Sequence, residues 1–240
     1  VLDESRSEFV SNVSHELKTP LTSISGFAEM MENGMADNSQ DVRRFAGRIY
    51  TQAQRLIALT DDIIRLSRIE RADLTENVPV ELRALCDRAV ETLRFTAEQK
   101  QVEIAVTGGP APVRGDRQML DELITNLMDN AVKYNRPGGR VDVSLSVQDG
   151  LVCLRVADTG IGIPKEHQER IFERFYRVDK SRSKASGGTG LGLAIVKHIV
   201  ELHSGKIALH SVPGEGTEIT VTLPSYVRRA AVSIAEGTDR

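Results

Sequence analysis

A histidine followed directly by a carboxylate, His15 and Glu16, lies near the start of the chain. Neutral imidazole is a good nucleophile when a neighbouring base takes the proton from its other ring nitrogen, and Glu16 is the available base. Thr19 follows one helical turn later, and Pro20 removes a backbone N–H group, so the helix should be distorted beside the histidine. These residues predict nucleophilic chemistry at His15, although an exposed histidine by itself is most often only a solvated surface residue.

A zinc site is the main rival, because His-Glu also opens the metalloprotease motif H-E-x-x-H. The fifth position is Thr19, so the second histidine ligand is missing and the zinc interpretation is rejected. The other histidines form no metal-ligand constellation, and His198 and His203 are expected to be packing or surface residues.

A second candidate site begins at residues 126–134. Asn126, Asn130 and Lys133 recur at helical spacing, so their polar ends should share one helix face, opposite an apolar one. Amide oxygens are hard ligands that suit Mg²⁺, and a nearby lysine suits phosphate. The alternative is a helix whose polar residues simply face water.

Three further segments fit the same site. Asp158 follows an apolar strand, where its carboxylate can accept a hydrogen bond from an exocyclic amine, and Gly160 and Gly162 let the backbone approach a flat ligand. The glycine-rich run 187–193 opens a helix, whose free N–H groups and dipole favour phosphates. The turn 214–217 would be an ordinary hairpin without the other segments. Together the four segments predict a nucleotide site.

The commoner nucleotide folds do not match these glycines. A G-x-G-x-x-G motif would need glycine where Lys165 and Leu193 stand, and no G-x-x-x-x-G-K-[ST] motif occurs, so Rossmann and P-loop folds are rejected. The basic stretch 165–184 indicates a mobile lid over a triphosphate, with Phe172 and Phe175 anchoring it against the domain. A solvated charged loop is the alternative.

The segment that carries His15 shows helical periodicity only, from residue 1 to about 72. Two apolar stripes separated by turn residues 33–40 predict a helical hairpin. The first stripe centres near Leu17 and Ile24, which puts His15 on the opposite, solvent-facing side. Two helices bury only part of their stripes on each other, so we expect a homodimer with a four-helix bundle, a structural stalk being the alternative. The stripes are Phe9, Val13, Leu17, Leu21, Ile24, Phe27 and Met31, then Val42, Phe45, Ile49, Leu56, Leu59, Ile63 and Leu66.

From about residue 76 the pattern changes to mixed α/β, which predicts a layer of helices on one face of a mixed sheet. The expected helices are 82–100, 117–134 and 191–202, and the expected strands are 102–107, 140–147, 151–157, 206–211 and 217–223.

The composition is ordinary for globular protein, and a net charge of -3 with a pI of about 6.0 disfavours nucleic-acid binding. No apolar run approaches the roughly 18 residues of a membrane span. Cys86 and Cys153 form no C-x-x-C pair, which favours a reducing compartment. The chain begins at Val1, and we expect a fragment of a longer protein whose missing part holds a membrane anchor.

Taken together, these motifs resemble the sensor histidine kinases of two-component systems, in the class with a His-Glu-[Leu/Ile]-[Lys/Arg]-[Thr/Asn]-Pro phosphoacceptor motif. The likeness covers nearly all of residues 5–224. It implies a dimerization and histidine-phosphotransfer domain at 1–72, a linker at 73–79, a catalytic ATP-binding domain at 80–225 and a flexible tail at 226–240. The second domain would have the Bergerat-type α/β sandwich shared with type II topoisomerases, ninety-kilodalton heat-shock chaperones and mismatch-repair ATPases.

The resemblance further implies an ATP- and Mg²⁺-dependent kinase that autophosphorylates His15 and passes the phosphoryl group to an aspartate of a response regulator receiver domain. Glu16 would be the general base, and Thr19 would orient water for a phosphatase activity toward that regulator. The protein would be a homodimer and the cytoplasmic portion of a bacterial inner-membrane sensor.

The same resemblance assigns the nucleotide site. Asn126 and Asn130 would surround Mg²⁺, and Asp158 would recognise the adenine amine. The phosphates would lie near Lys133, Tyr134 and Arg177, the base pocket would include Gly160, Gly162, Ile163 and Thr217, and the lid hinge would comprise Gly188, Thr189, Gly190, Leu191, Gly192 and Leu193.

Two other functions stay open. An ATPase or serine kinase of the same sandwich superfamily would need the nucleotide motifs but not the pair His15 and Glu16. A signalling scaffold without catalysis would be expected to lose residues such as Asn130 or Asp158, and both are present.

Overall fold

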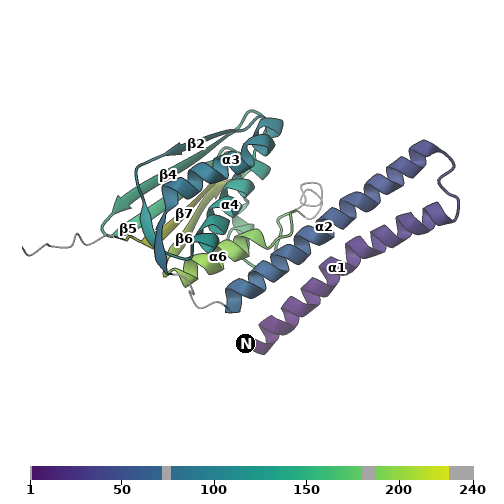
Figure 1. Ribbon diagram of the computed structural model, residues 1–240, viewed down its shortest axis with the longest axis horizontal. Coiled ribbons are helices and arrows are strands. Elements are labelled where there is room, and N and C mark those ends of the chain that lie inside the picture. The colour runs from purple at the N-terminus through teal and green to yellow at the C-terminus, as the bar shows by residue number, and fades with distance from the viewer. Residues whose placement is uncertain (1, 72–76, 180–187, 227–240) are drawn as a thin grey trace, which may run out of the picture.

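The computed structural model describes residues 2–71, 77–179 and 188–226, which form a long helical hairpin beside an α/β domain (Figure 1). Helices α1 (Leu2–Glu32) and α2 (Ser39–Arg71) run antiparallel and confirm the predicted hairpin. α2 begins earlier than the turn chemistry suggested, because Asn38 Oδ1 accepts the N–H groups of Gln40 and Asp41, both at 2.9 Å, and so caps the helix.

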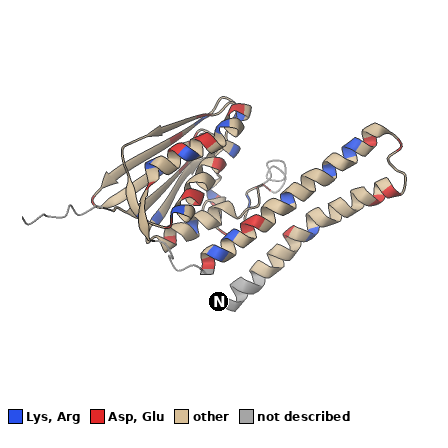
Figure 2. Ribbon diagram, viewed as in Figure 1, with Lys and Arg blue, Asp and Glu red and all other residues tan. Residues whose placement is uncertain are grey.

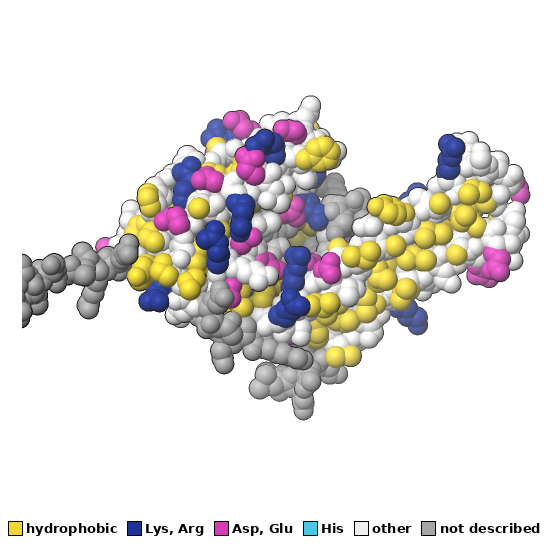
Figure 3. Space-filling model, in the orientation of Figure 1, with side chains coloured by type: hydrophobic (Ala, Val, Ile, Leu, Met, Phe, Trp, Pro, Cys, Tyr) yellow, Lys and Arg dark blue, Asp and Glu magenta, His cyan; other side chains and the backbone are white. Residues whose placement is uncertain are grey.

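The hairpin packs along one side only. Phe27 and Phe45 stack with ring centroids 5.8 Å apart near the tip, and Leu59 and Leu66 are buried nearer the α/β domain. Leu21, which the apolar stripe placed in the core, is 50% exposed. Val42, in the second stripe, is 40% exposed. Two helices cover only the centre of each stripe, so the residues at its margins stay open to water. Figure 3 shows hydrophobic side chains gathered along the hairpin.

The α/β domain contains a five-stranded sheet in the order β2-β4-β5-β7-β6, in which β2 and β4 are parallel and the other neighbours antiparallel. Its helices lie on one face of this sheet (Figure 1), which confirms the predicted mixed sheet with a helical layer. The elements are β1 (Val78–Glu81), α3 (Leu82–Lys100), β2 (Glu103–Thr107), β3 (Pro112–Gly115), α4 (Arg117–Lys133), β4 (Arg140–Gln148), β5 (Leu151–Asp158), the 3-10 turn η1 (Lys165–His167), α6 (Gly192–Leu202), β6 (Lys206–Val212) and β7 (Gly216–Pro224).

Two short strands, β1 and β3, were not predicted from the sequence. They pair antiparallel with each other. Four-residue strands are too short for an alternating pattern to stand out. The expected linker at 73–79 is therefore too long at its end, since Val78 and Pro79 already pair with Gly115 and Arg114, while residues 72–76 lie outside the described part.

The predicted tail begins one residue too early, because the Tyr226 N–H group donates to the Pro112 carbonyl at 2.8 Å. Residues 227–240 lie outside the described part of the chain. Among the described residues, no helix is both long and apolar enough to cross a bilayer.

The core lies between the sheet and α3, α4 and α6. Strand β5 alternates, with Val152 and Leu154 buried against the helices, and each fully buried aliphatic side chain contributes about 1.5–3 kcal/mol. This rigid layer holds the ends of β5, β7 and α4 together, where the candidate nucleotide segments lie.

Candidate active site

His15 is exposed on α1, as the helical wheel predicted. Thr19 is exposed on the same face, and its hydroxyl donates to the His15 carbonyl at 3.2 Å. Pro20 is buried inside the helix and has no N–H group for the carbonyl of Glu16, so the backbone hydrogen bond that is lost lies next to the histidine. The imidazole is therefore accessible to another domain or protein.

Glu16 is held by two arginines. Its Oε2 atom lies 3.4 Å from Arg55 Nη2 of α2 and 3.6 Å from Arg177 Nη2 of the α/β domain. The Arg177 side chain is only 7% exposed, and burial lowers its pKa while Glu16 opposes that shift. In this arrangement the carboxylate beside His15 is neutralised by cations.

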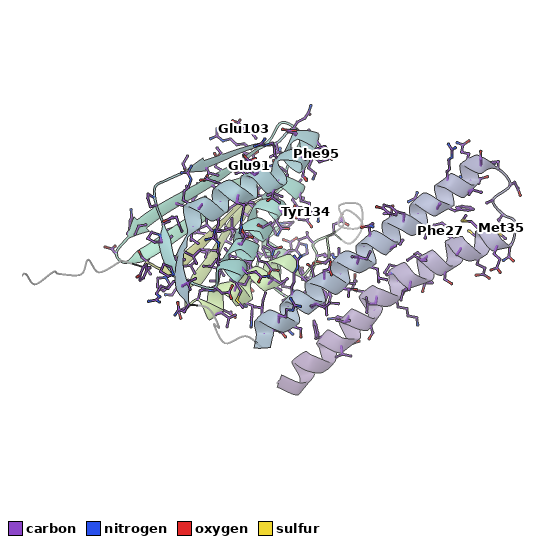
Figure 4. The ribbon with its side chains drawn as sticks, in the orientation of Figure 1. Phe27, Met35, Glu91, Phe95, Glu103 and Tyr134 are labelled. Carbon is purple, nitrogen blue, oxygen red and sulfur yellow. The ribbon has the colours of Figure 1, made fainter. Side chains whose placement is uncertain are left out.

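A cavity of about 800 Å³ lies in the α/β domain on the side that faces α2. This volume is within the usual range for small-molecule sites. The predicted nucleotide segments all contribute to its lining, and Figure 4 labels Tyr134 on this side, at the end of α4. Of the predicted residues, those that line it are Asn126, Asn130, Lys133, Tyr134, Asp158, Gly162, Ile163, Arg177, Gly188, Thr189, Gly190, Gly192, Leu193 and Thr217.

Helix α4 presents the polar face that its spacing predicted. Asp116 caps its start by accepting the N–H groups of Gln118 and Met119, and the apolar face packs into the core. Lys133 is largely buried, and burial lowers the pKa of its ammonium group, opposed mainly by Asp129. A desolvated lysine aimed at this cavity is well suited to a phosphate group.

Asp158 stands at the end of β5, opposite Thr217 in the ladder with β7. Its Oδ1 atom accepts N–H groups from Gly160 at 2.8 Å and Thr217 at 3.3 Å. Burial raises the pKa of this carboxyl more than the two hydrogen bonds lower it. Both of these bonds use Oδ1, so neither of them occupies Oδ2, and a carboxylate oxygen can accept further hydrogen bonds.

The start of α6 lies directly against α4. A Cβ atom on Gly192 would come within 3.1 Å of Asn126 Oδ1, so glycine permits this approach. The Leu191 N–H group donates to Thr189 Oγ1 at 3.3 Å. The glycine-rich helix start therefore faces the polar side of α4, as phosphate binding requires. Gly187 lies outside the described residues.

A buried serine, whose role was not predicted from the sequence, positions the loop after β5. Ser211 Oγ accepts the Ile163 N–H group at 2.8 Å and contacts the Thr217 hydroxyl at 2.8 Å. Gly162 adopts φ +67°, and a Cβ there would lie 2.1 Å from the Val212 carbonyl. Serine at a strand position gives no sequence signal, because its role depends on which loop crosses the strand.

The helical hairpin contributes to the cavity wall, which the sequence also did not predict. Ala58, Asp62 and Arg65 of α2 line it, and the Thr189 hydroxyl donates to Asp62 Oδ2 at 2.6 Å. Figure 2 shows that both positively and negatively charged residues occur along the part of α2 beside the α/β domain. The polar residues between the apolar positions of α2 were the only feature of the sequence that could have indicated this contribution to the cavity.

The lid prediction is partly corrected. Phe175 packs on Phe9 of the hairpin with ring centroids 5.8 Å apart, rather than anchoring the segment to its own domain alone. Phe172 lines a smaller cavity between the hairpin and the α/β domain. The segment folds into η1 and turns as far as Asp179, and residues 180–184 lie outside the described part.

The remaining histidines include one structural residue. His203 is buried, accepts the Asp116 N–H group at Nε2 and donates from Nδ1 to the Ile199 carbonyl, so it is a packing residue as expected. Within residues 2–71, 77–179 and 188–226, no group of three or more His, Cys, Asp or Glu side chains could hold a metal. A cation in the cavity would instead use the amide oxygens of Asn126 and Asn130, which suit Mg²⁺ with its retained waters.

Comparison with known proteins gives two family matches. Residues 5–72 match the His Kinase A (phospho-acceptor) domain, and residues 115–227 match the histidine kinase-, DNA gyrase B- and HSP90-like ATPase family. The chain is 42% identical over 228 residues to the sensor-like histidine kinase SenX3 of Mycolicibacterium smegmatis, covering 94% of this chain and 59% of that protein. It is 38% identical over 227 residues to the sensor histidine kinase WalK of Bacillus subtilis, covering 93% and 37%. These relatives are longer proteins, of which the chain spans little more than half or less.

Solved structures are also similar. The mycobacterial sensor histidine kinase MprB has a TM-score of 0.55 and 36% identity, covering 62% of this chain and 97% of that chain. The Acinetobacter baumannii histidine kinase AdeS has a TM-score of 0.68 over 88% of this chain and 97% of that chain, and its 23% identity supports the fold alone.

Proposed function

Because the chain belongs to the sensor histidine kinases of two-component systems, we propose that it binds ATP in the α/β cavity and phosphorylates its own His15. The observation that carries this proposal is the placement of Arg177. This residue lines the nucleotide cavity and also pairs with the carboxylate next to the exposed His15. One side chain thus links the proposed phosphate donor site to the proposed acceptor.

The site residues have distinct proposed roles. Asp158 accepts the adenine amine, and Lys133 neutralises phosphate charge beside the glycine-rich start of α6. Asn126 and Asn130 hold Mg²⁺, which supplies further charge neutralisation when bound. Positioning and charge neutralisation supply most of the rate in phosphoryl transfer, and the polar face of α4 supports both.

The transfer step requires the α/β domain to move. His15 is not among the residues that line the cavity, and Glu16 is paired with Arg55 and Arg177. When Arg177 leaves with the domain, Glu16 keeps only Arg55 as a cationic partner and is proposed to take the proton from the imidazole. The described arrangement is thus the resting one, and phosphorylation occurs in another.

Dimerisation is proposed through the uncovered face of the hairpin. Val10, Leu21, Ile57 and Ile64 are exposed large hydrophobic residues on α1 and α2. A second hairpin would cover them in a four-helix bundle. The proposed domains are the hairpin at 1–72 and an ATP-binding domain that begins with β1 at Val78, before the predicted residue 80, and extends to Tyr226.

The proposed product is a phosphohistidine whose phosphoryl group passes to an aspartate of a response regulator receiver domain. Thr19, exposed one turn from His15, would orient water when the reaction runs as a phosphatase. We also propose that the chain is the cytoplasmic part of a longer, membrane-anchored sensor; the relatives named as sensor histidine kinases are longer than this chain.

The test is incubation with γ-labelled ATP and Mg²⁺. We expect an acid-labile, base-stable label on the wild-type protein, its loss in His15→Ala, and full labelling in the control His210→Ala, which alters another exposed histidine. Label that survives His15→Ala would overturn the assignment. Rapid phosphate release unaffected by His15→Ala would favour an ATPase instead, and failure to bind ATP would favour a scaffold.

A further inference from the structure

Asp62 belongs to the helical hairpin but lies in the wall of the nucleotide cavity. Its Oδ2 atom accepts a hydrogen bond of 2.6 Å from the hydroxyl of Thr189, which is itself buried. Thr189 lies in the glycine-rich segment before α6, where phosphates are proposed to bind. A carboxylate of one domain therefore occupies a phosphate-binding element of the other.

The charges around Asp62 agree with this position. Burial raises the pKa of the Asp62 carboxyl overall. The positive charges of Arg65 and Lys133 lower this pKa, and the negative charge of Asp61 raises it. Lys133 is the same ammonium group that is proposed to neutralise the nucleotide phosphates. Asp62 and a triphosphate would thus share one cation and one hydroxyl.

We propose that Asp62 is a specificity-determining residue of the nucleotide site, which disfavours nucleotides according to their phosphate charge while the α/β domain is docked on the hairpin. The inference rests on the proposed ATP binding in this cavity. Two like charges a few ångströms apart in a partly buried site repel strongly, and the repulsion grows with each added phosphate.

Docking and nucleotide charge are therefore linked. If docking weakens the binding of a triphosphate by some factor, the triphosphate weakens docking by the same factor. Undocking separates Asp62 from Thr189 and also removes Arg177 from Glu16, at 3.6 Å in the docked arrangement. The charged nucleotide thus removes one of the two arginines from the carboxylate beside His15, and Arg55 of the hairpin remains.

The first experiment compares wild type with Asp62→Asn by calorimetric titration of the full chain with adenosine, ADP and ATP in the presence of Mg²⁺. The asparagine Oδ1 can still accept from Thr189, so the substitution removes charge and keeps the hydrogen bond. We expect ATP to bind about tenfold more tightly to Asp62→Asn, ADP to gain less, and adenosine to bind equally. The matched control is Asp61→Asn, at an exposed neighbouring carboxylate that does not line the cavity, and it should leave all three affinities unchanged.

Equal affinities in wild type and Asp62→Asn would overturn the inference, and so would a gain of the same size for adenosine, which carries no phosphate. A wild-type protein that binds none of the three ligands would instead remove the proposed function on which the inference rests.

A second measurement reports docking directly. Phe9 and Phe175 stack across the two domains, so a short bifunctional thiol reagent should cross-link Phe9→Cys and Phe175→Cys fastest in the docked state. We expect ATP to slow the cross-linking about tenfold, matching the affinity change by linkage, and to slow it much less when Asp62→Asn is added. Equal slowing in both backgrounds would contradict the role of Asp62.

Discussion

The two parts of this molecule differ in how completely they bury their apolar surface. The α/β domain contains nearly all of the largest fully buried side chains in the described part of the chain, and the hairpin contributes Leu66 to that set. The hairpin in turn carries more than half of the exposed large hydrophobic residues: Val10, Leu21, Met35, Val42, Tyr50, Ile57 and Ile64. The ATP-binding domain completes its core within one chain, whereas the hairpin that bears His15 needs a further surface to cover it.

The contact between the two parts combines ion pairs with apolar packing. Arg174 pairs with Glu70 at 2.6 Å, and Arg177 with Glu16 at 3.6 Å, while Phe9 and Phe175 supply an aromatic contact. Partly exposed ion pairs contribute little net stability, whereas Leu66 and Ile69 of α2 are buried in the same hydrophobic cluster as the core of the α/β domain. The difference teaches that the α/β domain buries its apolar residues within itself, while the hairpin divides its own between the α/β domain, the two helices and exposed positions.

The largest effect is expected where the hairpin is incomplete. Ile57→Lys combined with Ile64→Lys places charge on two exposed residues seven positions apart on α2. In a dimer this removes four buried side chains, each worth about 1.5–3 kcal/mol, so the dimer should dissociate. Light scattering measures the mass, and the control is Phe95→Lys, at a 69% exposed residue of α3. A double variant that remains dimeric would contradict the proposed bundle.

The complete core gives the next largest effect. Leu120→Ala empties a site that is fully buried in α4 and should lower the free energy of unfolding by about 2–5 kcal/mol. Leu151→Ala is the matched control, since Leu151 is 45% exposed at the start of β5 and should change stability by about 0.5 kcal/mol or less. Urea unfolding measures both. Similar losses for the two variants would mean that the domain core does not limit stability.

A substitution of Asp158 should weaken ATP binding and leave folding stability unchanged. Asp158→Asn removes the proposed charged acceptor for the adenine amine, a bond worth about 1.5–3 kcal/mol, so ATP affinity should fall roughly 10–150-fold in calorimetry. Folding should not suffer, because burial raises the pKa of this carboxyl and Asn Oδ1 can keep both backbone hydrogen bonds. Asp142→Asn, at an exposed carboxylate on β4, serves as the control and should bind ATP normally. Unchanged ATP affinity in Asp158→Asn would exclude the adenine role.

The smallest expected effect is a pH dependence confined to the α/β domain. Burial lowers the pKa of His203, which stays neutral by accepting the Asp116 N–H group. In the unfolded chain this imidazole takes up a proton near its ordinary pKa of about 6.5, whereas the folded state does so only at lower pH. Stability should therefore fall as pH drops below this value, by at most about 1.4 kcal/mol per pH unit.

Replacement of the imidazole isolates this contribution. His203→Gln should flatten that part of the stability profile measured by urea unfolding between pH 7 and 5, a range chosen around the histidine pKa of about 6.5. His210→Gln, at an exposed histidine of β6, should retain it. A slope that persists in His203→Gln would assign the pH dependence to other groups.

Much of the fold could be predicted because its elements carry strong local patterns. Helix α3 spans 82–100 as expected, and α4, β4 and β5 differ by a residue or so at their ends. Strands β1 and β3 could not be predicted, since four residues give no clear period and their pairing joins segments more than thirty residues apart.

The candidate site follows the same division. The residues at helical spacing on α4 and the carboxylate at the end of β5 were predicted from local rules, and they line one cavity. Asp62 and Ser211 could not be predicted, because each acts on a segment distant in the chain, through Thr189 and Ile163 respectively.

The sequence by itself determined the chemistry available to this protein: an exposed His15 opposite an apolar stripe, with a carboxylate beside it and a nucleotide site made of four separate segments. Local spacing and residue type are sufficient for such features. Only the tertiary structure decided that Glu16 lies against Arg177 and that Asp62 enters the nucleotide cavity. These contacts join groups far apart in the chain across the interface between the hairpin and the α/β domain, and no periodic pattern indicates which charged groups meet there.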